Sequence, residues 1–318
     1  MIFLKKIDIK KAVSFIGTIL MIASLFFVFS RLAQMQNDLD LSALSSPWVF
    51  MPLLLVVLGE GIAVILASIN YRSLIANISG VSVERRMAIK TYNIANMYKF
   101  IPGGIMYVLG RNRMAVETEG LSHGKVALAT LIEGILWVVA AITLSSIFAF
   151  DYFVYYVRQL DILPLVGLLL GLAVLIAIPI LYYFRSRLFA ALSNFKKDAS
   201  GLLAKALVKR LAFALVIVNL WGFFFLATLI ILGQPITPNL GITIVGLYIL
   251  SWVAGFLTPG APSGLGIREF ILLMFLGGIL NEDILLSAIV MHRALQIAGD
   301  IAAYIMASCY AQMKSKPR

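Results

Sequence analysis

Long apolar runs separated by short polar segments form the dominant pattern of the chain. A helix that crosses a bilayer needs about 20 mostly apolar residues. The runs that meet or approach this length are Ala12–Ser30, Pro47–Tyr71, Val126–Ala149, Ile162–Phe184, Leu211–Gly233, Leu240–Leu257, Ile267–Leu280 and Ile284–Tyr310. The run from Ile267 is short, and residues of the preceding loop would have to extend it. The pattern predicts an all-α integral membrane protein of about eight transmembrane helices, in one polytopic domain over residues 1–318.

A proline and two glycines, Pro102-Gly103-Gly104, interrupt the apolar stretch Thr91–Gly110. Lipid cannot hydrogen-bond an open backbone, so non-helical chain at membrane depth is expected only where protein or a water-filled cavity surrounds it. Basic residues occur on both sides, in 72–90 and in 111–125, and a full crossing would place one group outside the cell. We therefore predict a re-entrant hairpin here.

A second interruption, Thr258–Phe270, reads TPGAPSGLGIREF and lies between two apolar runs. Its two prolines and three glycines, with the adjacent ions Arg268 and Glu269, lie at or inside a membrane boundary. We interpret the stretch as a broken-helix binding element shaped by Pro259, Pro262, Gly264 and Gly266. The alternative is a tight turn between two spans, with Arg268 extending to the membrane surface.

The two interruptions resemble each other locally, since each places Pro-Gly after a phenylalanine and follows a pair of apolar runs. Interrupted apolar segments at corresponding places in two halves point to a transport site at a repeat interface. The spacing suggests pseudo-repeat halves at 1–184 and 211–318. We expect these halves to form a parallel repeat about an axis along the membrane normal.

Most of the 26 Lys and Arg residues fall before the first run, between the second and third, after the fourth and at the C-terminus. Cytoplasmic loops carry an excess of Lys and Arg. Eight spans with both termini in the cytoplasm place these groups on one side. The predicted location is the cell (inner or cytoplasmic) membrane, and the net charge of +11 reflects topology rather than binding to nucleic acid.

Ionisable residues within the predicted membrane depth define the candidate chemistry; they are Glu60, Glu133, Glu269, Asp300, Lys99, Arg268 and Arg293. A charge at the bilayer centre costs about 2.5–3.5 kcal/mol even on the lenient insertion scale, so each needs a partner or a hydrated cavity. Arg293, Gln296 and Asp300 are spaced i, i+3 and i+7, which places them on one helical face. A second polar stripe, Asn93, Asn96 and Lys99, precedes the first break.

An anion site follows if both breaks direct helix N-termini into one cavity, because free N–H groups and helix dipoles attract anions. Lys99, Arg268 and Arg293 would then bind phosphate, and Asn96 would support it by hydrogen bonding. The acids would neutralise the empty site or couple protons: Glu60, Glu269 and Asp300.

Each residue also has a structural interpretation. Arg293 and Asp300 would form an ion pair that only fixes helix packing. Glu60 would pair with Arg268 or Arg293, or be protonated and neutral in lipid. Asn93 and Asn96 would satisfy backbone exposed by the break, and His292 would be a packed polar residue.

Several function classes lack a sequence basis. The single Cys309 and two histidines provide no metal-ligand cluster, so neither a metal nor another cofactor is expected. No nucleotide-binding fingerprint occurs. Catalysis is not expected, because Ser263 lacks the GxSxG frame and no spacing brings Glu60 and Glu133 together as an acid/base pair.

These residues resemble the lysylphosphatidylglycerol synthase membrane-domain family, also called the flippase-like family. The first signature, in NIANMYKFIPGGIMYVLGR, comprises Asn96, Pro102, Gly103, Gly104 and Arg111. The second, in TPGAPSGLGIREF, comprises Pro259, Pro262, Gly264, Gly266, Arg268 and Glu269, and Arg293 follows in the last span. The chain departs from the family pattern at Ser263, where glycine is common, and at Ile105-Met106, where a Gly-Glu pair is frequent.

The resemblance implies a polytopic helical domain in which two re-entrant elements meet in a cavity and move lipids between leaflets. It adds Arg111 to the candidate substrate-binding residues. The expected partner is an anionic membrane lipid, either a phospholipid or a polyprenyl-phosphate-linked lipid. No predicted cytoplasmic segment is long enough for the aminoacyl-transferase domain of full-length relatives, so a synthase is not expected. The alternative is a non-transporting accessory protein that binds lipid or a cell-envelope biosynthesis enzyme, and a homo-oligomer is a further expectation.

Overall fold

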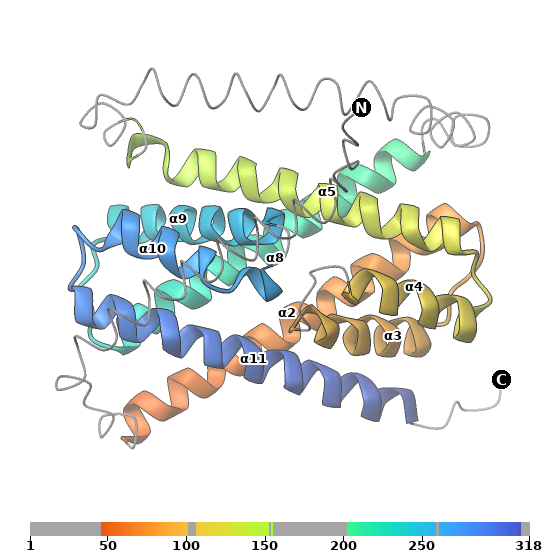
Figure 1. Cartoon of the computed structure of the whole chain (residues 1–318), viewed down its shortest axis with the longest axis horizontal. Coiled ribbons are helices and arrows are strands. Elements are labelled where there is room, and N and C mark those ends of the chain that lie inside the picture. Colours follow the sequence, from red (N-terminus) through yellow and green to blue (C-terminus); the bar gives the residue numbers. More distant parts are fainter. Residues whose placement is uncertain (1–45, 101–105, 153, 155–201, 259–260, 313–318) are drawn as a thin grey trace, which may run out of the picture.

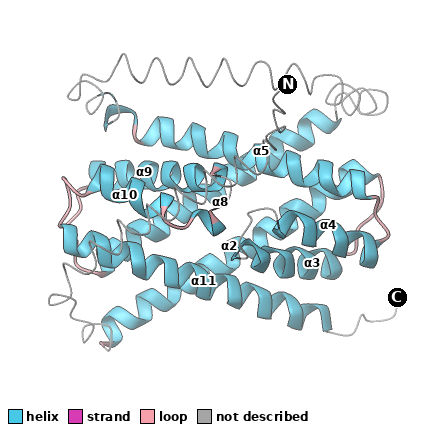
Figure 2. Ribbon diagram, in the orientation of Figure 1, coloured by secondary structure: helices cyan, strands magenta, loops and turns pink. Residues whose placement is uncertain are grey.

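The computed structural model describes residues 46–100, 106–152, 154, 202–258 and 261–312, and over these ranges the chain is helical with no strand (Figure 2). The long helices are α2 (Pro47–Ser79), α5 (His123–Phe148), α8 (Leu202–Ile231), α9 (Pro238–Leu257) and α11 (Glu282–Gln312). The short helices are α3 (Arg85–Met97), α4 (Met106–Glu119) and α10 (Ile267–Leu276), with 3-10 turns η2 (Tyr98–Phe100) and η3 (Pro262–Gly264). The predicted all-α class is confirmed.

Five helices of this set are long and apolar enough to cross a membrane, namely α2, α5, α8, α9 and α11. Each coincides with a span predicted from the apolar runs. The predicted span Ile267–Leu280 is different, because α10 ends at Leu276 after 10 residues. At 1.5 Å per residue this helix measures only about 15 Å, half the hydrocarbon thickness. The predicted spans Ala12–Ser30 and Ile162–Phe184 lie outside the described residues.

The first Pro-Gly interruption joins two short helices that lie side by side, α3 and α4 (Figure 1). They contain 13 and 14 residues. Neither reaches the length that a span requires. The turn η2 ends α3 near the middle of the molecule, and residues 101–105 lie outside the described ranges.

The second interruption joins α9 to α10, which also lie side by side (Figure 1). Between them, Ser263, Gly264 and Gly266 have φ angles of 52°, 68° and 83°. This left-handed region favours glycine, so the positive φ of Ser263 is a strained turn conformation. The turn η3 contacts η2, so the two helix breaks meet at the centre of the molecule.

The two hairpins approach this centre from opposite ends of the helix bundle (Figure 1). At one end, Lys125 Nζ at the start of α5 donates to the Ser79 carbonyl at the end of α2, over 2.8 Å. At the other end, the Tyr152 hydroxyl just after α5 donates to the Phe275 carbonyl in α10. The α3–α4 hairpin therefore starts and finishes at the end of the bundle marked by Lys125 and Ser79. The α9–α10 hairpin starts and finishes at the opposite end, marked by Tyr152 and Phe275.

The helix directions in the described residues differ from those of the expected parallel repeat. The order of elements is the same in each described half, with a long helix, a hairpin and a long helix, but α8 runs against α2 and α11 against α5 (Figure 1). Local similarity between two Pro-Gly motifs carries no information about chain direction. The arrangement corresponds to an inverted-topology repeat, whose axis lies in the membrane plane.

The long helices α2 and α11 approach closely at Gly61 and Gly299. A Cβ on Gly299 would come within 2.5 Å of the Glu60 Cβ and 3.2 Å of the Gly61 nitrogen. Small residues permit such close backbone approach in membrane proteins. The outward surface is apolar, as lipid contact requires, and includes Leu55, Ile62, Leu131, Val216 and Ile305.

Candidate functional site

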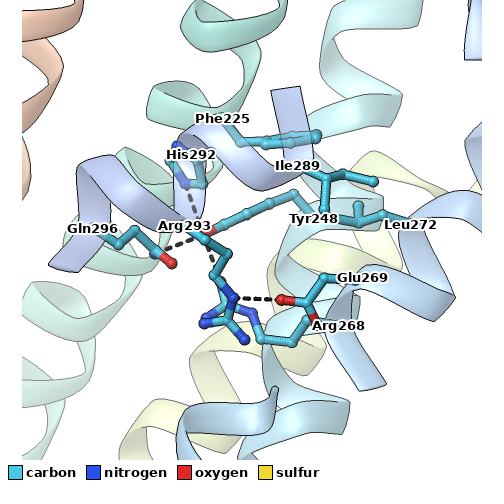
Figure 3. Close-up of a pocket in the computed structure, with 9 residues that line it drawn as sticks. All are labelled: Phe225, Tyr248, Arg268, Glu269, Leu272, Ile289, His292, Arg293 and Gln296. Atoms are coloured by element: carbon cyan, nitrogen blue, oxygen red, sulfur yellow. Dashed lines mark hydrogen bonds and ion pairs between the residues drawn. The ribbon is translucent and has the colours of Figure 1, made fainter. Parts of the chain in front are cut away.

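Polar side chains gather beside the hairpin tips, where α9, α10 and α11 enclose a small cavity (Figure 3). The polar lining residues are Tyr248, Arg268, Glu269, His292, Arg293 and Gln296. Three apolar side chains, Phe225, Leu272 and Ile289, complete the lining. Two of the three predicted phosphate-binding cations, Arg268 and Arg293, therefore share one site.

Arg293 connects α11 to the second helix break. Its Nε donates to Glu269 Oε1 over 2.5 Å, and its Nη2 donates to the Ser263 carbonyl over 3.1 Å. The other Glu269 oxygen, Oε2, is buried without a hydrogen-bond partner among the described residues. The Arg293–Glu269 pair thus fixes α10 and its preceding turn against α11.

Arg268 is buried, with 6% of its surface exposed, and its stem lies against two glycines. A Cβ on Gly255 would lie 2.6 Å from Arg268 Cγ, and one on Gly264 would lie 3.1 Å from Cδ. Arg268 Nη2 donates to the Tyr248 hydroxyl over 2.6 Å. Among the described residues, no carboxylate oxygen lies within 4.0 Å of this guanidinium. Arg268 is therefore a buried cation without an ion-pair partner in the described structure.

Tyr248 is the centre of the hydrogen-bond network in the cavity (Figure 3). Besides Arg268, its hydroxyl accepts from Gln296 Nε2 over 2.8 Å and lies 3.0 Å from His292 Nε2. The Tyr248 ring stacks on Phe225 with centroids 4.9 Å apart. The sequence alone does not single out Tyr248, because a tyrosine inside an apolar run carries no signal that separates it from core aromatics.

Glu60 lies beside His292, where α2 and α11 are in close contact. It is 3% exposed, and its Oε1 is 3.7 Å from His292 Nε2. The predicted ion pair between Glu60 and Arg268 or Arg293 is not formed in the described structure. His292 is packed, as its structural interpretation requires, and it also joins Glu60 to the cavity network.

Lys99 and Asn96 bind Asp300 instead of lining the cavity. Lys99 Nζ is 2.7 Å from Asp300 Oδ2, and Asn96 Nδ2 donates to Oδ1 over 2.8 Å. The interpretation that Arg293 pairs with Asp300 is wrong, since each has a partner on another element. Asn93 donates to the Ile89 carbonyl of its own helix. The first hairpin tip is thereby connected to α11.

Arg111 belongs to a separate buried cluster and does not line the cavity. It forms an ion pair with Glu133, and the Tyr92 hydroxyl donates to the other Glu133 oxygen over 3.0 Å. The guanidinium carbon lies 4.0 Å from the Tyr92 ring centroid and 4.6 Å from that of Tyr71. These cation–π contacts connect α4 to α2 and α3, and the ion pair with Glu133 connects it to α5.

The cavity is nearly closed in this conformation. Its free volume is about 10 Å³, which is room for about one water molecule. A phosphate group does not fit without movement of the surrounding side chains. Of the predicted shape-determining residues, Pro262, Gly264 and Gly266 form the second turn, while Pro102, Gly103, Gly104 and Pro259 lie outside the described residues.

Fold and site together define a helical membrane protein with buried charges where two helix breaks meet. Comparison with known proteins does not narrow this class, since no protein-family model and no curated protein matches the chain.

Proposed function

We propose that this protein binds an anionic, phosphate-containing lipid and promotes its movement between membrane leaflets. The observation that carries the proposal is Arg268, a buried cation at the meeting point of two broken helices, with a tyrosine hydroxyl as its hydrogen-bond partner. A charge at membrane depth is a functional-site hypothesis by default because it is costly to maintain. An anionic ligand would compensate it.

The neighbouring groups support a phosphate ligand in particular. Arg293 lines the same cavity as Arg268, so two guanidinium groups are available, and each can donate two parallel hydrogen bonds to phosphate. Arg293 is bound to Glu269, so a ligand would exchange with that carboxylate. Such exchange permits release as well as binding.

The inverted hairpins support translocation rather than binding alone. Sites at the interface of inverted repeats become accessible from either side when one repeat moves against the other. The closed cavity corresponds to an occluded state in this scheme. The signature TPGAPSGLGIREF, which resembles flippase-like proteins, favours the same function, and the lipid is a phospholipid or a polyprenyl-phosphate-linked lipid.

The test is lipid movement in proteoliposomes that contain fluorescent phosphatidylglycerol or phosphatidylcholine. We expect the protein to accelerate movement of the anionic lipid, and Arg268→Ala and Arg293→Ala each to reduce this rate at least tenfold, the effect of about 1.4 kcal/mol. Arg113→Ala is the matched control, because Arg113 is an exposed arginine with an i, i+4 partner. Equal rates for both lipids, or full activity of both variants, would contradict the proposal.

A non-transporting accessory protein is the alternative from a different class. The nearly closed cavity favours it, because a headgroup does not fit the conformation described. Specific lipid binding with no movement of any lipid would establish this alternative.

A further inference from the structure

Glu60 and His292 form a buried pair next to the cavity, and lipid binding as proposed above does not require it. They come from α2 and α11, and their side chains are 4% and 3% exposed. Glu60 Oε1 has no hydrogen-bond partner among the described residues, although it lies 3.7 Å from His292 Nε2. A buried polar atom without a partner is rare in proteins and calls for an explanation.

The hydrogen bonds of Thr228 determine where the His292 proton lies. The Thr228 hydroxyl donates its one hydrogen to the Phe224 carbonyl over 2.8 Å. It can therefore only accept from His292 Nδ1, which is 3.3 Å away. Nδ1 carries a proton in this arrangement, and Nε2 is left as the site of any change in protonation.

The hydrogen bonds of Tyr248 then determine the state of Nε2. The Tyr248 oxygen accepts from Arg268 and from Gln296. Its own hydrogen is free to donate, and the acceptor at hydrogen-bond distance is His292 Nε2, at 3.0 Å. His292 is therefore neutral in this arrangement, and it accepts the Tyr248 hydroxyl hydrogen, which is then not available to an anion.

A proton on Nε2 would reverse this arrangement. Once Nε2 and Glu60 Oε1, now 3.7 Å apart, come within hydrogen-bond distance, the new N–H would donate to this oxygen, which gives the unpartnered oxygen a hydrogen bond and forms an ion pair. Tyr248 would lose its acceptor, and its hydroxyl would turn to donate into the cavity beside Arg268. Protonation of the pair thus creates one more hydrogen-bond donor for an anion in the cavity.

The charges around the Glu60–His292 pair also link proton binding to anion binding. Two cations, Arg268 on α10 and Arg293 on α11, face His292. Glu60 faces Arg268, Lys99 of η2 and Asp300 of α11. From α8 and α9, His292 contacts the uncharged residues Phe225, Thr228 and Tyr248. An anion bound at the two arginines would cancel their field, so a proton is bound more tightly when the anion is present.

We infer that Glu60 and His292 form a proton-binding site that is linked through Tyr248 to the anion site, so that a proton and an anionic lipid headgroup bind together. This inference rests on the proposed function and adds its coupling ion. Linkage is reciprocal, so an anion that increases proton affinity is itself bound more tightly at lower pH. Downhill proton movement would then drive lipid movement in the same direction.

The direct test is proton uptake during lipid binding by the detergent-solubilised full chain. The probe is short-chain phosphatidylglycerol, because its phosphodiester keeps one negative charge throughout the pH range used. In weakly buffered solution with a pH-sensitive dye, we expect up to one proton to be taken up for each lipid bound. The dissociation constant of the lipid should rise by up to about tenfold for each unit by which the pH is increased, which is the limit for one linked proton.

Three variants and a control separate the contributions. Glu60→Gln and His292→Gln should bind the lipid with little pH dependence and without proton uptake. Tyr248→Phe should reduce the uptake, because it removes the hydroxyl that links the two sites and leaves only the field of the two arginines. Glu117→Gln, which alters an exposed carboxylate on α4, should behave as the parent protein.

The outcomes distinguish this inference from the proposed function. Lipid binding by the parent protein without proton uptake, at an affinity independent of pH, would overturn the coupling and leave lipid binding intact. Absence of lipid binding at any pH would overturn both. If Glu60→Gln does not fold, the uptake by the parent protein and its reduction in Tyr248→Phe still decide the question.

Discussion

Gly255 shows how closely the site depends on single residues. Its hydrogen faces the Arg268 stem, and a Cβ there would approach Cγ to 2.6 Å. Overpacking of this kind costs about 1–3 kcal/mol. Because the clash falls on a side chain of the site, the substitution should displace the guanidinium from Tyr248.

We therefore expect Gly255→Ala to lower the affinity for short-chain phosphatidylglycerol at least tenfold and to lower the thermal unfolding temperature in detergent. Gly278→Ala is the matched control, since the Gly278 Cβ position has open space around it. It should change neither quantity. Normal lipid affinity in Gly255→Ala would show that the position of Arg268 does not determine binding.

Individual partners are the part of the site that sequence could not predict. Arg293 and Asp300 share a helical face, but an i, i+7 separation places them about 10 Å apart along the axis. Each ion binds a residue of a different hairpin, Glu269 and Lys99 respectively. Such pairings depend on tertiary contacts between distant segments. The residue types at the site, by contrast, were predictable because ions in apolar runs are conspicuous.

The two hairpins hold their arginines in comparable aromatic surroundings. Arg111 of α4 lies over Tyr92 of α3, and Arg268 of α10 lies over Tyr248 of α9, with 4.0 and 5.3 Å to the ring centroids. The two arginines differ in whether a carboxylate balances their charge. Arg111 has Glu133 within ion-pairing distance, whereas Arg268 has no carboxylate within 4.0 Å in the described structure. We interpret the first as a fixed structural contact and the second as the ligand site.

This difference predicts that Glu133→Gln chiefly destabilises the fold. Loss of one partner leaves Arg111 buried and uncompensated, which typically costs about 3–5 kcal/mol. The thermal unfolding temperature in detergent should fall clearly, and the double substitution Arg111→Met with Glu133→Gln should recover much of it, because no unpaired charge remains. If the unfolding temperature of the double variant falls as far as that of Glu133→Gln, this interpretation is contradicted.

Across the whole molecule, the long apolar helices were predictable because few alternatives exist for such sequence in lipid. The opposite directions of the two hairpins were not. Direction depends on how many times the intervening chain crosses the membrane, and a local motif does not encode that number. The length of α10 was also misjudged, since apolar composition continues through Gly277–Leu280 after the helix has ended.

The inverted arrangement predicts that the two hairpin bases face opposite sides of the membrane. Single cysteines at Val81, before α3, and at Ile279, after α10, would report this in a Cys309→Ser background, because both positions are exposed. A membrane-impermeant maleimide should label Ile279→Cys in intact cells and Val81→Cys only in inside-out vesicles, given the basic residues beside Val81. Labelling of both from the same side would contradict the arrangement.

The glycine contact between α2 and α11 has a mechanical consequence. Gly299 divides α11 into arms of about 25 and 20 Å, at 1.5 Å per residue. If the helices pivot where their backbones touch, a rotation of about 10° would move the arm ends by about 3–5 Å. Glu60 and Asp300 are adjacent to this pivot point, so they would move very little while the ends of the two helices separate and approach.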